Sequence, residues 1–117
     1  MTPTNLLFIL SDEHNKRVTG CYGHPMVRTP HVDALAARGT RFTSAYTNCP
    51  ICVPARASFA TGRYVHDVRC WDNAIGYQGK PASWGHRLIE QGHHVAVIGK
   101  LHYRDPKPQV NGFNEEV

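Results

Sequence analysis

The feature that most restricts the fold is an unbroken apolar run, Leu6-Leu7-Phe8-Ile9-Leu10, which leads directly into Ser11-Asp12-Glu13. Apolar residues without alternation are typical of a strand that is buried on both faces, as in a parallel sheet covered by helices. In such sheets, ligands gather beyond the carboxyl ends of the strands. The run therefore predicts a central strand with two carboxylates at the edge where a site is expected.

Helix and strand signals alternate along the rest of the chain. Proline, serine or threonine at the start and glycine just after the end predict three helices: Thr29-Pro30 to Gly39, about Pro54 to Thr61, and Ser83 to Gln91. Further strands are expected at Thr40 to Thr47 and His94 to Ile98. The order predicts an α/β fold, with a mostly parallel sheet flanked by helices.

The segment that says most about function runs from Cys52 to Arg63 and reads CVPARASFATGR. A cysteine precedes a proline-started helical turn, and Arg56 follows four residues later, on the same face of the helix. The first turn of a helix presents free N–H groups and a positive dipole end to an anion. The segment therefore predicts a site around Cys52 that handles an oxyanion.

The pattern Cys52-x-Pro54-x-Arg56, followed by Thr-Gly-Arg, resembles the signature of the type I sulfatase family of the alkaline phosphatase superfamily. The segment Trp71-Asp72-Asn73-Ala74 looks similar to choline-sulfatase-like and phosphonate monoester hydrolase-like members. The resemblance implies that Cys52 is converted to formylglycine, by a formylglycine-generating or an anaerobic maturation enzyme. It also implies hydrolysis of a small anionic substrate, a sulfuric ester.

A divalent cation is part of the same resemblance. Sulfatases commonly carry an Asp-Asp pair after the first strand, where this chain has Asp12-Glu13. Asp12 matches the ligand position, whereas Glu13 is longer by one methylene and matches it less well. Carboxylates suit Ca²⁺, Mn²⁺ and Mg²⁺, and Ca²⁺ is the expected ion. Cys52, as formylglycine, is the third ligand expected from these 117 residues.

The segment Gly99-Lys100-Leu101-His102 resembles the Gly-Lys-x-His segment of the family. Lys100 is expected to bind a sulfate oxygen, and His102 to hydrogen-bond the nucleophile or the leaving oxygen. In an extended stretch, both side chains would point the same way. Arg56 is expected to hold the formylglycine oxygens, and Asn73 to donate to the substrate oxyanion.

Three other functions stay open. The same nucleophile serves phosphonate monoester and phosphodiester hydrolases, although those enzymes often have uncharged or hydroxyl residues where Lys100 and His102 stand. Cys49 and Cys52 could form a zinc or redox module, but Cys21 and Cys70 are single and distant and supply no second pair. The third is a non-catalytic fragment, because the family completes its site with residues farther downstream.

Length, composition and charge indicate the size of the domain, its partners and its location. A chain of 117 residues with 41% hydrophobic residues can form one modest core. Sulfatases are several times longer, so residues 1–117 are expected to be the N-terminal part of a catalytic domain. The net charge of +4 comes from scattered basic residues, which favours neither a nucleic-acid nor a membrane partner. The N-terminus lacks the features of a signal peptide, which predicts a cytoplasmic protein with reduced cysteines.

Overall fold

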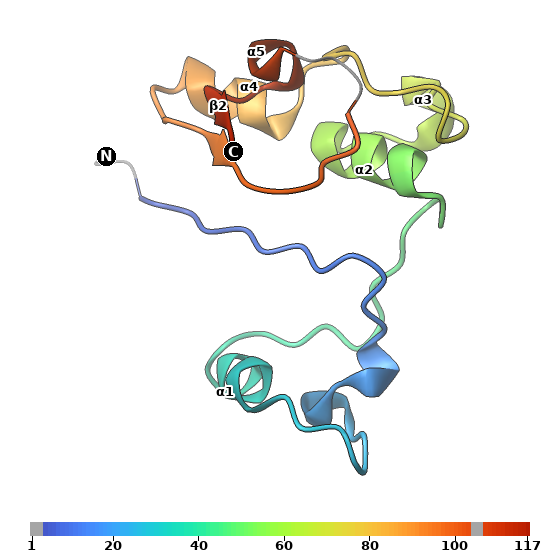
Figure 1. The fold of residues 1–117 in the computed structure, drawn as a ribbon, viewed down its shortest axis with the longest axis vertical. Coiled ribbons are helices and arrows are strands. Elements are labelled where there is room, and N and C mark those ends of the chain that lie inside the picture. The colour runs from blue at the N-terminus through green and yellow to red at the C-terminus, as the bar shows by residue number, and fades with distance from the viewer. Residues whose placement is uncertain (1–3, 104–106) are drawn as a thin grey trace. The chain divides into compact units, whose positions relative to one another are not determined.

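The computed structural model describes residues 4–103 and 107–117. The chain forms two compact units, the first ending at Ala45 and the second running from Tyr46 to Val117 (Figure 1). None of the described helices is long and apolar enough to cross a membrane.

The first unit contains two 3₁₀ turns, η1 (Lys16–Val18) and η2 (Gly20–Tyr22), and the helix α1 (Pro30–Arg38). Asp33 on α1 connects the helix to η2 and to Thr29. Its Oδ1 accepts hydrogen bonds from the Cys21 backbone N–H at 2.6 Å and from Thr29 Oγ1 at 2.8 Å. Thr29 is the N-cap residue, as expected, but its side chain makes no capping bond to α1. Instead, its hydroxyl accepts from the Gly20 N–H at 2.8 Å and so helps join η2 to the helix.

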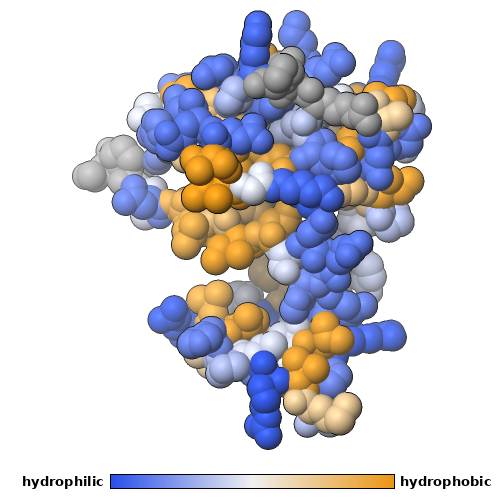
Figure 2. All heavy atoms as spheres, in the orientation of Figure 1, coloured by the Kyte–Doolittle hydropathy of each residue, from blue (hydrophilic) through white to orange (hydrophobic). Residues whose placement is uncertain are grey.

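Two predicted strands are absent among the described residues. The run from Leu6 to Leu10 is not part of a sheet, and its side chains are 48–82% exposed. Residues 40–47 are irregular as well. A strand exists only as part of a ladder with a neighbour, and the sequence pattern of one segment does not supply that neighbour. The apolar side chains of this run contribute to the hydrophobic atoms at the surface in Figure 2.

The second unit contains α2 (Cys52–Thr61), α3 (Val65–Val68), α4 (Trp84–Glu90), β1 (Ala96–Val97), α5 (Pro108–Asn111) and β2 (Glu115–Glu116). The two strands pair in parallel, with Ala96 opposite Glu115 and Val97 opposite Glu116. The three expected helices all form, and α2 begins two residues earlier than expected, so that Cys52 lies inside the helix. The short elements α3, α5 and β2 were not predicted.

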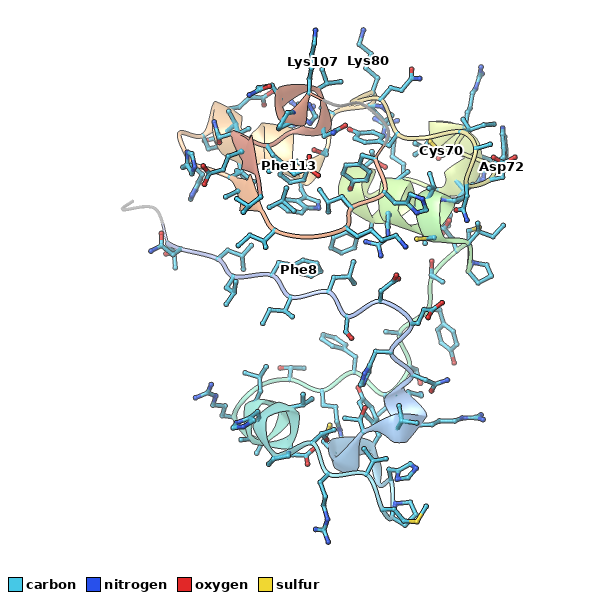
Figure 3. All side chains as sticks on the ribbon, viewed as in Figure 1. Phe8, Cys70, Asp72, Lys80, Lys107 and Phe113 are labelled. Atoms are coloured by element: carbon cyan, nitrogen blue, oxygen red, sulfur yellow. The ribbon has the colours of Figure 1, made fainter. Side chains whose placement is uncertain are left out.

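Aromatic rings and close backbone contacts hold the second unit together. Tyr77 is fully buried and Phe113 is 2% exposed; Phe113, after α5, and Cys70, after α3, are labelled in Figure 3. At Gly112, φ is 91°, and an added Cβ would lie 2.4 Å from Ser83 Oγ. Because Ser83 caps α4 together with His86, a glycine is needed where the chain after α5 passes the start of that helix.

Candidate active site

Cys52 is the first residue of α2, and a distant side chain supplies the cap of this helix. The N-cap residue, Ile51, has no side-chain acceptor. The Oδ1 atom of Asn73, on the loop after α3, accepts a hydrogen bond from the Val53 backbone N–H at 2.9 Å. One of the free N–H groups next to Cys52 is therefore satisfied, and this contact fixes the amide of Asn73 beside the start of the helix.

Arg56 lies one helical turn after Cys52 and connects α2 to the segment that follows β1. Arg56 is only 9% exposed. The Nε–H donates to the Cys52 sulfur at 3.1 Å, and Nη1 donates to the Lys100 backbone carbonyl at 2.9 Å. The expected placement of Cys52 and Arg56 on one helix face is thus confirmed, and the planar guanidinium uses two separate donors at once.

His102 approaches the same sulfur from the segment after β1. Its Nδ1 lies 3.3 Å from Cys52 Sγ. The backbone of His102 has φ = 63°, in the left-handed region, so the expected extended geometry of residues 100–102 is wrong at this residue. The side chain of Lys100 is exposed, and its backbone carbonyl is the group that contacts Arg56. The site therefore gathers Cys52, Arg56, Asn73 and His102 around the start of α2.

Tyr103, which the sequence reasoning missed, packs between Arg56 of α2 and the aromatic core of the second unit. Its hydroxyl donates to the Arg56 backbone carbonyl at 3.5 Å. Its ring meets Tyr77 edge-on, with centroids 5.1 Å apart, and lies nearly parallel to Phe113 at 6.3 Å. The available signal was an aromatic residue directly after the Gly-Lys-x-His segment.

The buried Tyr77 and the half-buried Tyr103 stay neutral to a higher pH than an ordinary tyrosine. Burial strongly raises the pKa of Tyr103; nearby Tyr77 raises it further, and the Arg56 guanidinium partly opposes both effects. Burial also raises the pKa of Tyr77, despite hydrogen bonding with Ser83 that lowers it. The interior wall behind the site is therefore aromatic and uncharged.

The carboxylates predicted as metal ligands lie in the first unit. Asp12 and Glu13 are both exposed, and Glu13 has φ = 56°, in the left-handed region. Over residues 4–103 and 107–117, no group of three His, Cys, Asp or Glu side chains is close enough to hold a metal ion. The two neighbouring carboxylates have the right chemistry for a hard divalent cation, but they are only part of a complete ligand set.

A zinc or redox module gains no support from the cysteines. All four thiols are free, and Cys70 is buried. In this structure, Cys52 contacts Arg56 and His102 rather than a second cysteine ligand.

Comparison with known proteins decides the family. The sulfatase family model matches residues 4–114. The chain belongs to the sulfatase family. It is 36% identical over 113 residues to a choline-sulfatase of Rhizobium meliloti (strain 1021), covering 97% of this chain and 22% of that protein. It is 33% identical to an N-acetylglucosamine-6-O-sulfatase of Bacteroides thetaiotaomicron over 98 residues, 84% of this chain and 18% of that protein.

A solved structure agrees with the fold of this sulfatase chain. It is the structure of BT4656 in complex with its substrate D-glucosamine-2-N,6-O-disulfate, with a TM-score of 0.77 and 29% sequence identity. The match covers 90% of this chain and 21% of that one. The predicted sulfatase-like α/β class is thereby confirmed. The chain spans about a fifth of the length of the relatives that it matches.

Proposed function

We propose that the protein carrying this chain hydrolyses sulfuric esters with a formylglycine made from Cys52. The observation that carries the proposal is the convergence of Arg56 Nε and His102 Nδ1 on the Cys52 sulfur, at 3.1 and 3.3 Å, in a chain of the sulfatase family. On this proposal, residues 1–117 are part of a longer catalytic domain, and the chain alone is expected to show no turnover.

The contacts of the thiol fit the proposed modification. The sulfur atom occupies the place where the oxygens of a formylglycine hydrate would be attached to Cβ, so the donors that now contact sulfur would contact those oxygens. A formylglycine supplies a hydrated aldehyde, with one hydroxyl to attack the sulfur of the ester and a second to release sulfate afterwards, an exit that a thiol lacks.

The surrounding side chains divide the remaining tasks. Arg56, which is buried and keeps its proton, donates through Nε and neutralises negative charge at the nucleophile. His102, which contacts the same atom, exchanges a proton with the nucleophile or with the leaving oxygen. Lys100 carries an exposed ammonium group that binds a sulfate oxygen. Asn73 donates from its amide nitrogen to the substrate, because its oxygen already faces the Val53 N–H.

A divalent cation, with Ca²⁺ first and Mn²⁺ or Mg²⁺ as alternatives, is the proposed cofactor. Asp12 and Glu13 would supply carboxylate oxygens to it, as part of a larger ligand set. When bound, such an ion supplies positive charge that favours an ionised hydroxyl on the nucleophile.

The proposed substrate is a small sulfate ester. The sulfated sugar bound in the BT4656 structure and the names of the two related sulfatases support an anionic ester as the substrate class. A phosphonate monoester or phosphodiester is the second candidate, because such esters share the tetrahedral anionic group. The proposed partner is the enzyme that converts Cys52.

Two measurements on the full-length protein, produced with a maturation enzyme, test the proposal. Mass spectrometry of the peptide from Phe42 to Arg56 should show a loss of about 18 Da at Cys52, from the change of CH₂SH to CHO. Steady-state kinetics should give a higher kcat/KM for an aryl sulfate than for an aryl phosphonate monoester, and Cys52→Ala should abolish both. An unmodified Cys52 in an active enzyme, or a preference for the phosphonate, would contradict the proposal.

A further inference from the structure

The segment that brings His102 to Cys52 is held at both ends. At one end, the Lys100 carbonyl accepts from Arg56 Nη1 at 2.9 Å. At the other end, the hydroxyl of Tyr103 reaches the Arg56 carbonyl at 3.5 Å. Both contacts are made to the same residue of α2, so this short segment is fastened to the helix that carries Cys52.

Between these two contacts, His102 adopts an unfavourable backbone conformation. A non-glycine residue with φ near 63° is less stable than one in the right-handed region. A conformation of this kind persists only when surrounding contacts fix it. The side chain that can do this most directly is that of Tyr103, the next residue in the chain.

The ring of Tyr103 is fixed more firmly than its hydroxyl. It contacts Tyr77, which is fully buried, and Phe113, which is 2% exposed. Aromatic pairs of this kind are stabilising beyond the area that they bury. The hydroxyl contact, in contrast, is at the long limit of a hydrogen bond. The ring is therefore the main anchor.

We propose that Tyr103 is a positioning residue, whose ring, packed against Tyr77 and Phe113, holds the imidazole of His102 against residue 52. Its effect on turnover rests on the proposed function, whereas its effect on the geometry of His102 does not. On this proposal, Tyr103 acts through His102 and not through a contact of its own with the reacting atoms.

Kinetics of the full-length, converted enzyme on an aryl sulfate test the effect on turnover. Tyr103→Leu should lower kcat by about 10- to 100-fold, since a small misplacement of a catalytic group is enough for such a loss. KM should change by less than about threefold, because substrate binding is left intact. Tyr103→Phe should stay within about threefold of the wild type, because the ring remains. The matched control, Tyr64→Leu, removes a tyrosine that is 62% exposed and should have no effect.

A double-mutant cycle distinguishes positioning from a general structural role. If Tyr103 acts through His102, Tyr103→Leu should cause no further loss of kcat in a His102→Ala background. Independent, multiplying losses would overturn the proposal, and so would equal losses in the Phe and Leu variants. If Tyr103→Leu does not fold, Phe113→Leu, which removes one stacking partner, takes its place in the cycle.

A readout without catalysis keeps the proposal separate from the proposed function. In full-length protein made without a maturation enzyme and labelled with ¹³C-histidine, His102→Gln identifies the His102 imidazole signal among those of the other histidines. Cys52→Ala should shift this signal in the wild-type background but not in the Tyr103→Leu background. A shift of equal size in both backgrounds would overturn the positioning role even if the enzyme proves to be a sulfatase. The expected difference would support it even if no sulfatase activity is found.

Discussion

The Nδ1 atom of His102 lies 3.3 Å from the sulfur of Cys52, although 50 residues separate the two in the chain. Arg56 reinforces this relationship, because it contacts both the same sulfur and the backbone of Lys100. All of these contacts lie within the second unit. The start of α2 and the segment after β1 therefore form one local arrangement, and its parts can be tested separately.

Replacing Arg56 with lysine should damage both stability and activity. A single ammonium cannot reproduce the two separate donors that reach Cys52 and Lys100, and hydrogen bonds to charged groups contribute about 1.5–3 kcal/mol. We expect a loss of about that size in the free energy of urea unfolding for Arg56→Lys. In the full-length enzyme, kcat/KM should fall by about 100-fold or more, as for the loss of one oxyanion donor.

The matched control for this substitution is Arg87→Lys. Arg87 pairs with Glu90 at 3.0 Å on the surface of α4, with 68% of its side chain exposed. The expected change in unfolding free energy is below about 0.5 kcal/mol. Equal losses for the two variants would show that the buried contacts of Arg56 do not stabilise the unit.

Two substitutions of Asn73 separate its capping role from its proposed donor role. Asn73→Ala removes the acceptor of the Val53 N–H and should cost about 1 kcal/mol of stability. Asn73→Asp keeps an oxygen acceptor and places a negative charge near the start of α2, which is favourable there. We therefore expect thermal unfolding near that of the wild type, but kcat/KM on an aryl sulfate reduced about as much as in the Ala variant. An Asp variant with full activity would refute the donor role.

Gly112→Ala should be more destabilising than Gly92→Ala. The two glycines have similar backbones, with φ of 91° and 85°, so alanine is strained at both by about 1–2 kcal/mol. A Cβ at Gly92 meets nothing within 4 Å, whereas at Gly112 it would lie 2.4 Å from Ser83 Oγ and 2.6 Å from His86 Nδ1. Overpacking there should add about 1–3 kcal/mol, measured by urea unfolding. Equal losses would mean that the cap of α4 moves aside freely.

Stability should fall as the pH rises above about 10, the ordinary pKa of tyrosine. Burial raises the pKa of Tyr103 and of Tyr77 in the folded chain, so these hydroxyls keep their protons there after they ionise in the unfolded chain. The folded state then binds more protons, and the unfolding free energy decreases with pH. Urea midpoints from pH 8 to pH 11 measure this slope. This slope should become shallower in Tyr103→Phe.

The sequence predicted best those elements that depend on neighbouring residues, such as helix caps and helical spacing. The helices at 30–38, 52–61 and 84–90 were predicted from their caps and terminal glycines, and the fold class from their order. The Cys52–Arg56 contact followed from helical spacing alone. Roles carried over from the family for Asp12, Glu13, Asn73, Lys100 and His102 stay predictions.

The parts that the sequence did not predict depend on distant partners. The strands expected at 6–10 and 40–47 need neighbours that no local pattern specifies, and β2 pairs with β1 from 19 residues downstream, Glu115 lying opposite Ala96. The left-handed backbone of His102 could not be predicted from the residue type, because histidine adopts it more often than most non-glycine residues but still in a small minority of cases. It is explained only once the ring contacts of Tyr103 are seen.

The distance along the chain between Cys52 and His102 also matters for the order in which they are synthesised. At about 5–20 residues per second, a ribosome needs roughly 3–10 s to add the residues between Cys52 and His102. During these seconds, the nascent chain carries Cys52 before the groups that will contact it from residues 100–103 have been made. If Cys52 is converted as we propose, an enzyme that acts before residues 100–103 have folded would meet a thiol without its His102 contact.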